Sequence, residues 1–285
     1  MFKPHSHPPA LPSQWPAKRN IAVSVSIMLE GWTDDSAPGL GPMGNPLKAG
    51  VLDTQARSWA AYGPKVGAWR ILDILGEAGV KAVFYTSGIL AERYPELMRA
   101  IVQEGHNVAA HAWAQNIIPA YQTAEQEEAD LKRSVQALET YSGMRPTGWI
   151  SPRVTPSDNT VDILSRNGFR WHADAFDQDL PYQIANKHGR LVAVPFTVEV
   201  NDVPLYVRYG NEPSAFNNIL LTILEGWSGI KNPASCLDIT VHAHVFGRPM
   251  GAIIFQRALE IAQQKDTVWM TTHAELADIY YDFNN

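Results

Sequence analysis

The chain is poor in cysteine, in basic charge and in long apolar runs, and each shortage excludes a class of protein. Cys236 is the only cysteine among 285 residues, which excludes an internal disulfide framework and fits a reducing compartment. The formal net charge of −6 argues against a general nucleic-acid binder, because phosphate binding needs a clustered basic surface. Residues 1–20 hold no apolar run long enough for a signal peptide or a membrane span, so we expect a cytoplasmic protein without a membrane partner.

The composition provides enough apolar material for one large α/β domain. Hydrophobic residues make up 45% of the chain and charged residues 18%. The first 19 residues are rich in proline and polar side chains, and we predict that they form an extended arm. Residues 20–285 show no break in pattern, which predicts a single domain.

Strand-like and helix-like segments alternate along this domain. In "IAVSVSIMLE", residues 21–30, the odd positions are bulky aliphatics, whereas the even positions are small residues, Met28 and finally Glu30. This pattern suits a barrel strand with helices outside and little room inside, and it points Glu30 inward. Six or seven such strands between helices predict a parallel sheet that is closed or nearly closed. One helix has the sequence of a capping box at Thr123 and Gln126.

Polar side chains recur where the predicted strands end. In a βα barrel these carboxyl-terminal strand ends form the active site, so we expect the side chains to meet there. A carboxylate, imidazoles and a guanidinium at one depth suit hydrolysis, with a base for water, an acid for the leaving group and a cation for an oxyanion. The candidates are Glu30, His111, Arg153, the cluster Asp174, Asp177 and Asp179, and the pair His242 and His244.

Each candidate also has a purely structural interpretation. Glu30 could be an ion-paired carboxylate at a strand end, and His111 a packed, hydrogen-bonded imidazole. Arg153 could tie two loops together. A Gly- and Pro-rich segment follows Glu30. Residues 31–60 could form a loop that closes over the site, or one that leaves it open.

Several stretches together resemble a known family. "GAWRILDIL", "ERYPELMRAIVQEGHNVAAHAW", "RPTGWISPR", "DAFDQDLPY" and "ITVHAHVFGRP" are similar, in order and spacing, to the polysaccharide-deacetylase (NodB-homology) superfamily. Within it they resemble the allantoinase and cyclic-imide-hydrolase branch. The resemblance implies an α/β fold of the distorted (β/α)7 barrel type and hydrolysis of an amide C–N bond.

The resemblance also assigns roles, and two positions depart from the pattern. It places Glu30 as the metal carboxylate, His111 as the first metal histidine, His242 as the late catalytic acid and Arg153 as the support of the base. However, Leu29 stands where the family has its base, and Gln115 stands where it has its second metal histidine. Two strong ligands rarely hold Zn²⁺, so we expect no metal cofactor. If Zn²⁺ or another divalent metal is bound, Glu30 and His111 are its expected ligands, with Asp34 or Asp35 as a possible third.

These residues predict a hydrolase of non-peptide C–N bonds that acts on a small cyclic amide, imide or ureide without a metal. Glu30 activates or positions water, His242 protonates the leaving nitrogen, and His111 and Arg153 orient Glu30 or stabilise the oxyanion. The predicted substrate-binding residues are Trp32, Trp113, Trp149, Asp179 and His244. The alternatives are a polysaccharide or N-acetyl sugar deacetylase and, from another class, a non-catalytic binding protein on a degenerate barrel. The aromatic and proline-rich arm favours a homo-oligomer.

Overall fold

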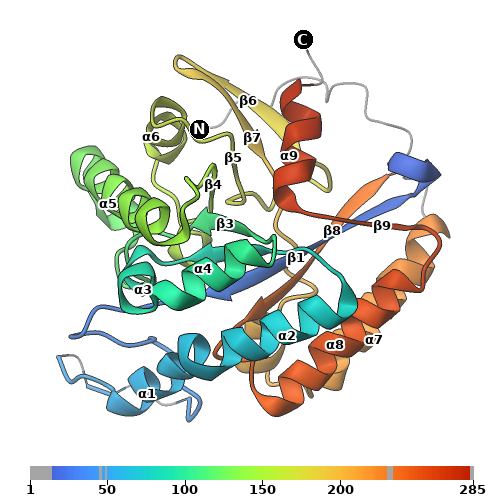
Figure 1. Ribbon diagram of the computed structural model, residues 1–285, viewed down its shortest axis with the longest axis horizontal. Coiled ribbons are helices and arrows are strands. Elements are labelled where there is room, and N and C mark those ends of the chain that lie inside the picture. The colour runs from blue at the N-terminus through green and yellow to red at the C-terminus, as the bar shows by residue number, and fades with distance from the viewer. Residues whose placement is uncertain (1–14, 45–46, 49, 230–233, 283–285) are drawn as a thin grey trace.

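A computed structural model describes residues 15–44, 47–48, 50–229 and 234–282 as an α/β fold (Figure 1). Within these residues one sheet has the order β6-β7-β5-β4-β3-β2-β1-β8, and β9 pairs with the first half of β1. The strands are β1 Ile21–Leu29, β2 Val83–Thr86, β3 Asn107–Ala110, β4 Gly148–Trp149, β5 Trp171–His172, β6 Tyr182–Asn186, β7 Gly189–Ala193, β8 Ser235–His242 and β9 Val268–Thr271.

The sheet curls into an incomplete barrel, which confirms the predicted fold class. Seven strands from β7 to β8 run parallel in that order, as the strand count predicts. The sequence did not predict β6, which forms an antiparallel hairpin with β7 at one edge. Beyond β7, Asn201 forms an isolated parallel bridge with Thr240 of β8, so this part of the chain covers the open side of the barrel.

Helices cover the outside of the sheet. α2, α7 and α8 pack together along one side, and α3, α4 and α5 follow beside them (Figure 1). The helices are α1 Thr54–Tyr62, α2 Ala68–Ala78, α3 Gly88–Arg93, α4 Pro95–Gln103, α5 Ala124–Ser142, α6 Thr160–Arg166, α7 Ser214–Gly226, α8 Pro249–Gln263 and α9 His273–Asp282. Short helical turns are η1 Pro16–Lys18, η2 Gly63–Gly67, η3 Pro119–Tyr121, η4 Pro152–Val154, η5 Val203–Arg208 and η6 Trp227–Gly229. The capping box at the start of α5 is present with both of its hydrogen bonds.

The two faces of β1 pack as its alternation predicts. The odd-numbered aliphatics lie in the large hydrophobic cluster between the sheet and helices α2, α4 and α8. Ser24 and Ser26 point into the barrel, where both hydroxyls donate to Asp238 at 2.6 and 2.9 Å. The Nε2 atom of His273 lies 3.1 Å from the same carboxylate, so the barrel interior is filled by a connected polar group rather than by a cavity.

Most of the predicted arm, residues 1–14, lies outside the described residues. Of its last five residues, Trp15 packs against the barrel, whereas Pro16, Ala17 and Lys18 are exposed. Trp15 is buried, its indole nitrogen donates to the Ser235 carbonyl at 2.9 Å, and its ring lies 5.8 Å from that of Trp269. These contacts fix the chain immediately before β1.

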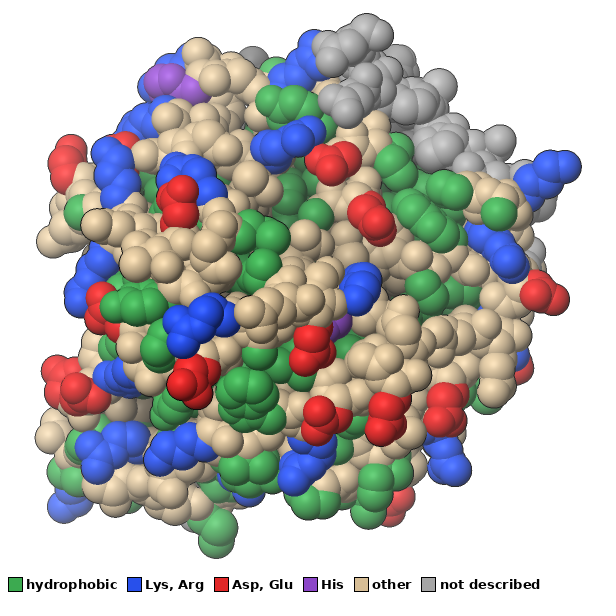
Figure 2. Space-filling model, in the orientation of Figure 1, with side chains coloured by type: hydrophobic (Ala, Val, Ile, Leu, Met, Phe, Trp, Pro, Cys, Tyr) green, Lys and Arg blue, Asp and Glu red, His purple; other side chains and the backbone are tan. Residues whose placement is uncertain are grey.

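On the face shown in Figure 2, basic and acidic side chains are interspersed. That distribution agrees with the absence of a basic excess in the composition. Among the described helices, none combines the length and apolar character that crossing a membrane requires.

Candidate active site

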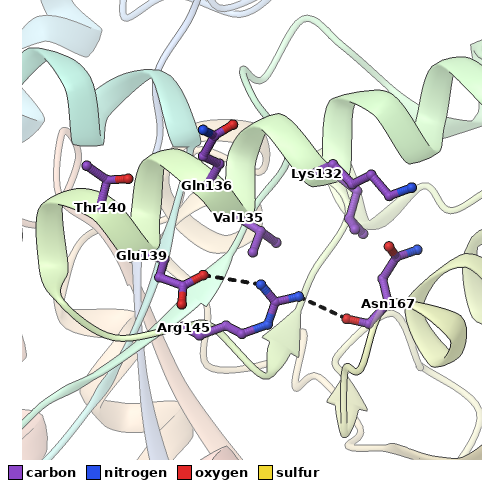
Figure 3. A pocket seen from close by; sticks show the side chains of 8 residues that line it. Lys132, Val135, Gln136, Glu139, Thr140, Arg145 and Asn167 are labelled. Carbon is purple, nitrogen blue, oxygen red and sulfur yellow. Dashed lines mark hydrogen bonds and ion pairs between the residues drawn. The ribbon is translucent and has the colours of Figure 1, made fainter.

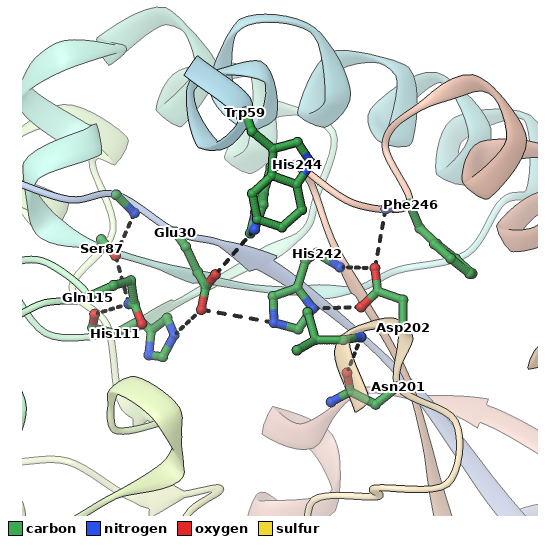
Figure 4. Close-up of polar contacts among 12 residues, drawn as sticks. Glu30, Trp59, Ser87, His111, Gln115, Asn201, Asp202, His242, His244 and Phe246 are labelled. Carbon is green, nitrogen blue, oxygen red and sulfur yellow. Dashed lines mark hydrogen bonds and ion pairs between the residues drawn. The ribbon is translucent and has the colours of Figure 1, made fainter. Parts of the chain in front are cut away.

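Glu30 lies at the centre of a group of imidazoles at the carboxyl-terminal end of β1. Its Oε1 is 3.6 Å from Nε2 of His111 and 3.9 Å from Nε2 of His242. Its Oε2 is 3.9 Å from Nε2 of His244 (Figure 4). The Glu30 side chain is 14% exposed, so it can be reached from solvent, whereas the three imidazoles are almost fully buried.

Strand register brings these residues to one depth. Met28 is paired with His242 in neighbouring strands, and Thr86 is paired with both Leu29 and Ala110. Glu30 and His111 therefore follow strands that end at the same level. The sequence prediction that these residues meet is in agreement with this geometry.

His111 is held by one ring nitrogen and free at the other. Its Nδ1 lies 2.8 Å from the Ile150 carbonyl, which can only accept, so Nδ1 carries the proton. Its Nε2 is buried and has no hydrogen-bond partner. Ala112, the next residue, has φ of 55°, and this left-handed turn directs the chain away from the strand end. The free Nε2 lone pair thus faces Glu30.

His242 is held by a carboxylate instead. Its Nδ1 lies 2.6 Å from Oδ1 of Asp202, and the Oδ2 atom accepts the backbone N–H groups of His242 and Phe246 at 2.8 and 3.2 Å. Burial lowers the pKa of His242, but the charges of Asp202 and Glu30 outweigh this effect and raise it above its ordinary value. His242 therefore keeps a second proton more readily than an ordinary imidazole does.

The pKa values of Glu30 and His244 are both lowered. Burial alone would raise the pKa of Glu30, but His242, the close approach of His111 and then His244 lower it to about 2. Burial lowers the pKa of His244 to about 4, against the opposing effect of Glu30. Near neutral pH the site thus holds an ionised Glu30 and an uncharged His244.

Gln115 braces the strand ends. Its Nε2 donates to Ser87 Oγ at 3.0 Å and to the His111 carbonyl at 3.2 Å, and its backbone N–H donates to the Gly31 carbonyl at 2.8 Å. The backbone N–H of Gly31 donates to the same Ser87 oxygen at 3.1 Å. Gln115 thus holds together the segments that follow β1, β2 and β3.

The donors present do not fit the metal centre of the standard family members. Across the described parts of the chain, no group of three or more His, Cys, Asp or Glu side chains is arranged to hold a metal ion. The position of the second metal histidine holds Gln115, whose amide nitrogen is used in hydrogen bonds.

Of the predicted substrate-binding residues, Trp32 and His244 lie at the site. Their rings are 5.8 Å apart and nearly perpendicular. The side chains of Trp113 and Trp149 pack in the hydrophobic core at 3% and 1% exposure, so their contact with a substrate stays a prediction. The Trp113 ring lies 3.5 Å from the Arg133 guanidinium, and the Trp149 nitrogen donates to Ser151 Oγ at 3.0 Å.

Two predictions need correction. Arg153 is exposed and, within the described chain, makes no hydrogen bond or ion pair with Glu30. Asp179 is exposed, and its carbonyl accepts the backbone N–H of Cys236, at the opposite end of β8 from His242. Asp174 is the aspartate of the predicted cluster that lies at the strand ends: it accepts the N–H and hydroxyl of Ser151 at 2.7 and 2.6 Å, and burial raises its pKa to about 6.

Asp202 and Trp59 are the site residues that the sequence did not reveal. Asp202 ends a segment predicted as strand-like, which is the criterion that selected Glu30, so this signal was available. Trp59 lies on α1, within residues interpreted as an irregular loop, and its ring is 4.5 Å from that of His244. Only the fold reveals that position.

A surface hollow on α5 is separate from this group. Figure 3 shows Arg145 on its floor, donating to Glu139 at 3.2 Å and to the Asn167 carbonyl at 3.1 Å. None of the strand-end residues lines it.

An incomplete parallel barrel with a carboxylate among imidazoles at its strand ends is the arrangement that the sequence predicts for a deacetylase-type hydrolase. Residues 61–172 match the polysaccharide deacetylase family. This match confirms the resemblance to that family found in the sequence.

Several relatives extend this similarity over almost the whole chain. A solved structure of Puue allantoinase is 26% identical, with a TM-score of 0.87 over 98% of this chain and 95% of its own. A probable polysaccharide deacetylase from Pseudomonas aeruginosa PAO1 is 26% identical, with a TM-score of 0.85 over 94% and 93%. A peptidoglycan deacetylase from Helicobacter pylori is 23% identical over 78% of this chain and 86% of its own.

Proposed function

We propose that this protein, a hydrolase of C–N bonds, opens a small cyclic amide, imide or ureide by acid–base chemistry of its own side chains. The observation that supports this best is the contact of one Glu30 oxygen with two imidazoles that have different partners. The Nδ1–H of His242 donates a hydrogen bond to the carboxylate of Asp202, whereas the Nδ1–H of His111 donates one to a neutral carbonyl. Two groups with such different surroundings are suited to be an acid and a base.

His242 is the proposed acid and His111 the proposed base. The water oxygen attacks the amide carbon while Nε2 of His111 takes its proton. The C–N bond then breaks, and the leaving nitrogen takes a proton from Nε2 of His242, so a ring amide yields an open-chain acid with a terminal amine or amide. The atoms balance with one water added.

Glu30 acts in this scheme as an anion. With a pKa of about 2 it is a weak base at neutral pH, so proton removal from water falls to His111. The carboxylate accepts a hydrogen bond from the attacking water and stabilises the positive charge on the imidazoles beside it. Of the two roles that the sequence predicts for Glu30, this proposal keeps the positioning of the water and gives its activation to His111.

We propose that the reaction needs no metal, because the neutral Gln115 amide, a weak ligand, stands in place of one expected histidine. No step above passes through a metal. A Zn²⁺ ion bound by Glu30 and His111 is the alternative, and chelation distinguishes the two.

A polysaccharide or N-acetyl sugar deacetylase is the second candidate, favoured by the family match and by the name of the Helicobacter pylori relative. The small ring amide is favoured by the high structural similarity to Puue allantoinase. A non-catalytic binding protein is disfavoured by the intact His242–Asp202 pair, which a binding barrel does not need. We also propose a cytoplasmic location, a homo-oligomeric state and a small-molecule partner rather than nucleic acid or membrane.

The test is a screen of the purified protein on cyclic imides, ureides and acetylated sugars, with Glu30→Gln as the paired variant. We expect ring opening by the wild type and a fall in kcat of about 100-fold or more in Glu30→Gln, since loss of one preorganised electrostatic group at a reacting centre costs about 10²- to 10³-fold. Binding of ring amides without turnover would support the binding protein, and turnover of acetylated sugars alone would support the deacetylase. Wild-type rates in correctly folded Glu30→Gln would overturn the proposed mechanism.

A further inference from the structure

The described part of the chain places one aromatic side chain directly against the group around Glu30 from a segment outside the barrel. The Trp59 ring lies 4.5 Å from the His244 ring at 86°, an edge-to-face contact. His244 in turn lies 3.9 Å from Glu30, and Trp32 packs on it from another direction at 5.8 Å. Figure 4 shows Trp59 and His244 together beside Glu30.

We propose that Trp59 is a specificity-determining and positioning residue, which holds His244 beside Glu30 and walls the site so that small flat substrates are preferred over sugar chains. This inference rests on the proposed hydrolysis of ring amides and adds the residue that sets the preference.

The helix that carries Trp59 is fixed to the site at its backbone. Arg248 donates to the Trp59 carbonyl at 3.4 Å and to the His244 carbonyl at 3.1 Å, so one guanidinium joins the helix to the segment after β8. The same guanidinium lies 4.1 Å from the centre of the Tyr62 ring, and Arg70 donates to the Tyr62 hydroxyl at 2.8 Å. Cation–π contacts and charged hydrogen bonds of this kind hold α1 as a wall rather than a free lid.

The turn after α1 comes close to the site for a structural reason. η2 is a wider π-helical turn, a feature frequent at functional sites. A Cβ added at Gly63 would lie 3.2 Å from the His244 nitrogen, and one added at Gly67 would lie only 1.9 Å from the Ala243 oxygen. Glycine at these positions therefore lets the helix reach the chain between His242 and His244.

The second aromatic residue of the wall is also fixed. Arg93 donates to the Trp32 carbonyl at 2.9 Å and to the Asp34 carboxylate at 2.6 Å. The next residue, Thr33, exchanges hydrogen bonds with Asn116 at 3.2 and 2.9 Å. Trp32 and Trp59 thus flank His244 from two anchored segments.

The chemistry of this wall favours a flat, uncharged group. His244 is buried and flanked by two indoles, so this side of Glu30 offers ring edges and faces with little polar surface. A planar ring amide can contact such a surface while its carbonyl lies at Glu30. A pyranose chain is thicker and carries hydroxyls around every ring, so it needs more room and more polar partners beside Glu30 than a ring amide does.

The test compares Trp59→Ala and Trp59→Phe with the wild type, with Trp69→Ala as control. Trp69 is 40% exposed on the outside of α2, so its removal changes the tryptophan count without changing the wall. The readouts are kcat and KM for hydantoin and succinimide as ring probes and for tetra-N-acetylchitotetraose as the chain probe. Circular dichroism and urea unfolding confirm that each variant is folded.

We expect Trp59→Ala to lower kcat/KM for the ring probes by about 10-fold or more, mainly through KM, as for the loss of a few apolar contacts in a pocket. Activity on the sugar chain should stay the same or rise, and Trp59→Phe should restore most of the ring preference. An unchanged ratio of ring to chain activity in both Trp59 variants, with the wild type opening rings, would overturn this inference alone. A wild type that opens no ring amide would overturn the proposed function and this inference together.

Discussion

Two histidines at the site differ in the partner of one ring nitrogen. His242 and His111 both present Nε2 to Glu30, and both have Nδ1 fixed, one by the Asp202 carboxylate and one by the Ile150 carbonyl. A carboxylate stabilises imidazolium, whereas a carbonyl only fixes the tautomer. The proposed assignment of acid and base rests on this single difference.

Asp202→Asn tests that assignment. In the wild type the acid form of His242 is lost as pH rises through its raised pKa, so activity falls on the alkaline side. Removal of the Asp202 charge lowers that pKa, so the alkaline fall should move to lower pH and kcat at neutral pH should drop by about 100-fold. The measurement is the pH profile of kcat, with Asp73→Asn, an exposed residue of α2, as control. An alkaline limb at the wild-type pH would contradict the role of His242.

The sequence identified some site residues and missed others for physical reasons. Glu30, His111 and His242 could be predicted because polar residues at strand ends meet in a parallel barrel. The sequence could not distinguish the buried Trp149 from a residue that lines a pocket, because it does not show which face of a short strand packs against helices. Arg153 follows its strand through a turn at φ of 57°, which carries its side chain to the surface.

At the scale of elements, a helix or strand could be predicted where its residues repeat at a regular spacing, and could not where they do not. The alternation of β1 and the capping box of α5 are visible because burial and capping restrict residue choice at fixed spacing. The sequence does not predict α1 as a helix, because only Ala56 and Ala60 among its residues are buried and they form no apolar stripe. β6 is only partly buried along its length, so it shows no clear alternation either.

Two glycines of one helical segment allow a matched test of how α1 is placed. Gly67→Ala should destabilise the protein by about 1–3 kcal/mol and lower activity, because the added methyl meets the Ala243 carbonyl and displaces α1. Gly76→Ala, in open space within α2, should stabilise it by about 0.5–1 kcal/mol. Urea unfolding and ring-opening rates measure both effects. Equal stability and activity of the two variants would show that the approach at Gly67 is not needed.

At the scale of the whole molecule, the curled sheet brings β1, β3 and β8 to a common edge, and the rest of the chain closes around it. Segments distant in sequence supply the group: residue 30, residue 111, and residues 202–244. The fold class was predictable from the strand and helix order, but the substrate was not, since one barrel supports several hydrolyses. The resemblance places Leu29 at the position of the usual base and Gln115 at that of the second metal histidine.

The most direct measurement of the central claim is the ring-opening rate of the whole protein before and after exhaustive chelation, with elemental analysis of the same sample. If Glu30, His111 and His242 suffice, kcat/KM should be unchanged within about 2-fold, a difference of about 0.4 kcal/mol in barrier. Added Zn²⁺ should then have no activating effect. Loss of activity on chelation, restored by stoichiometric Zn²⁺, would contradict the account and make the group around Glu30 a metal site.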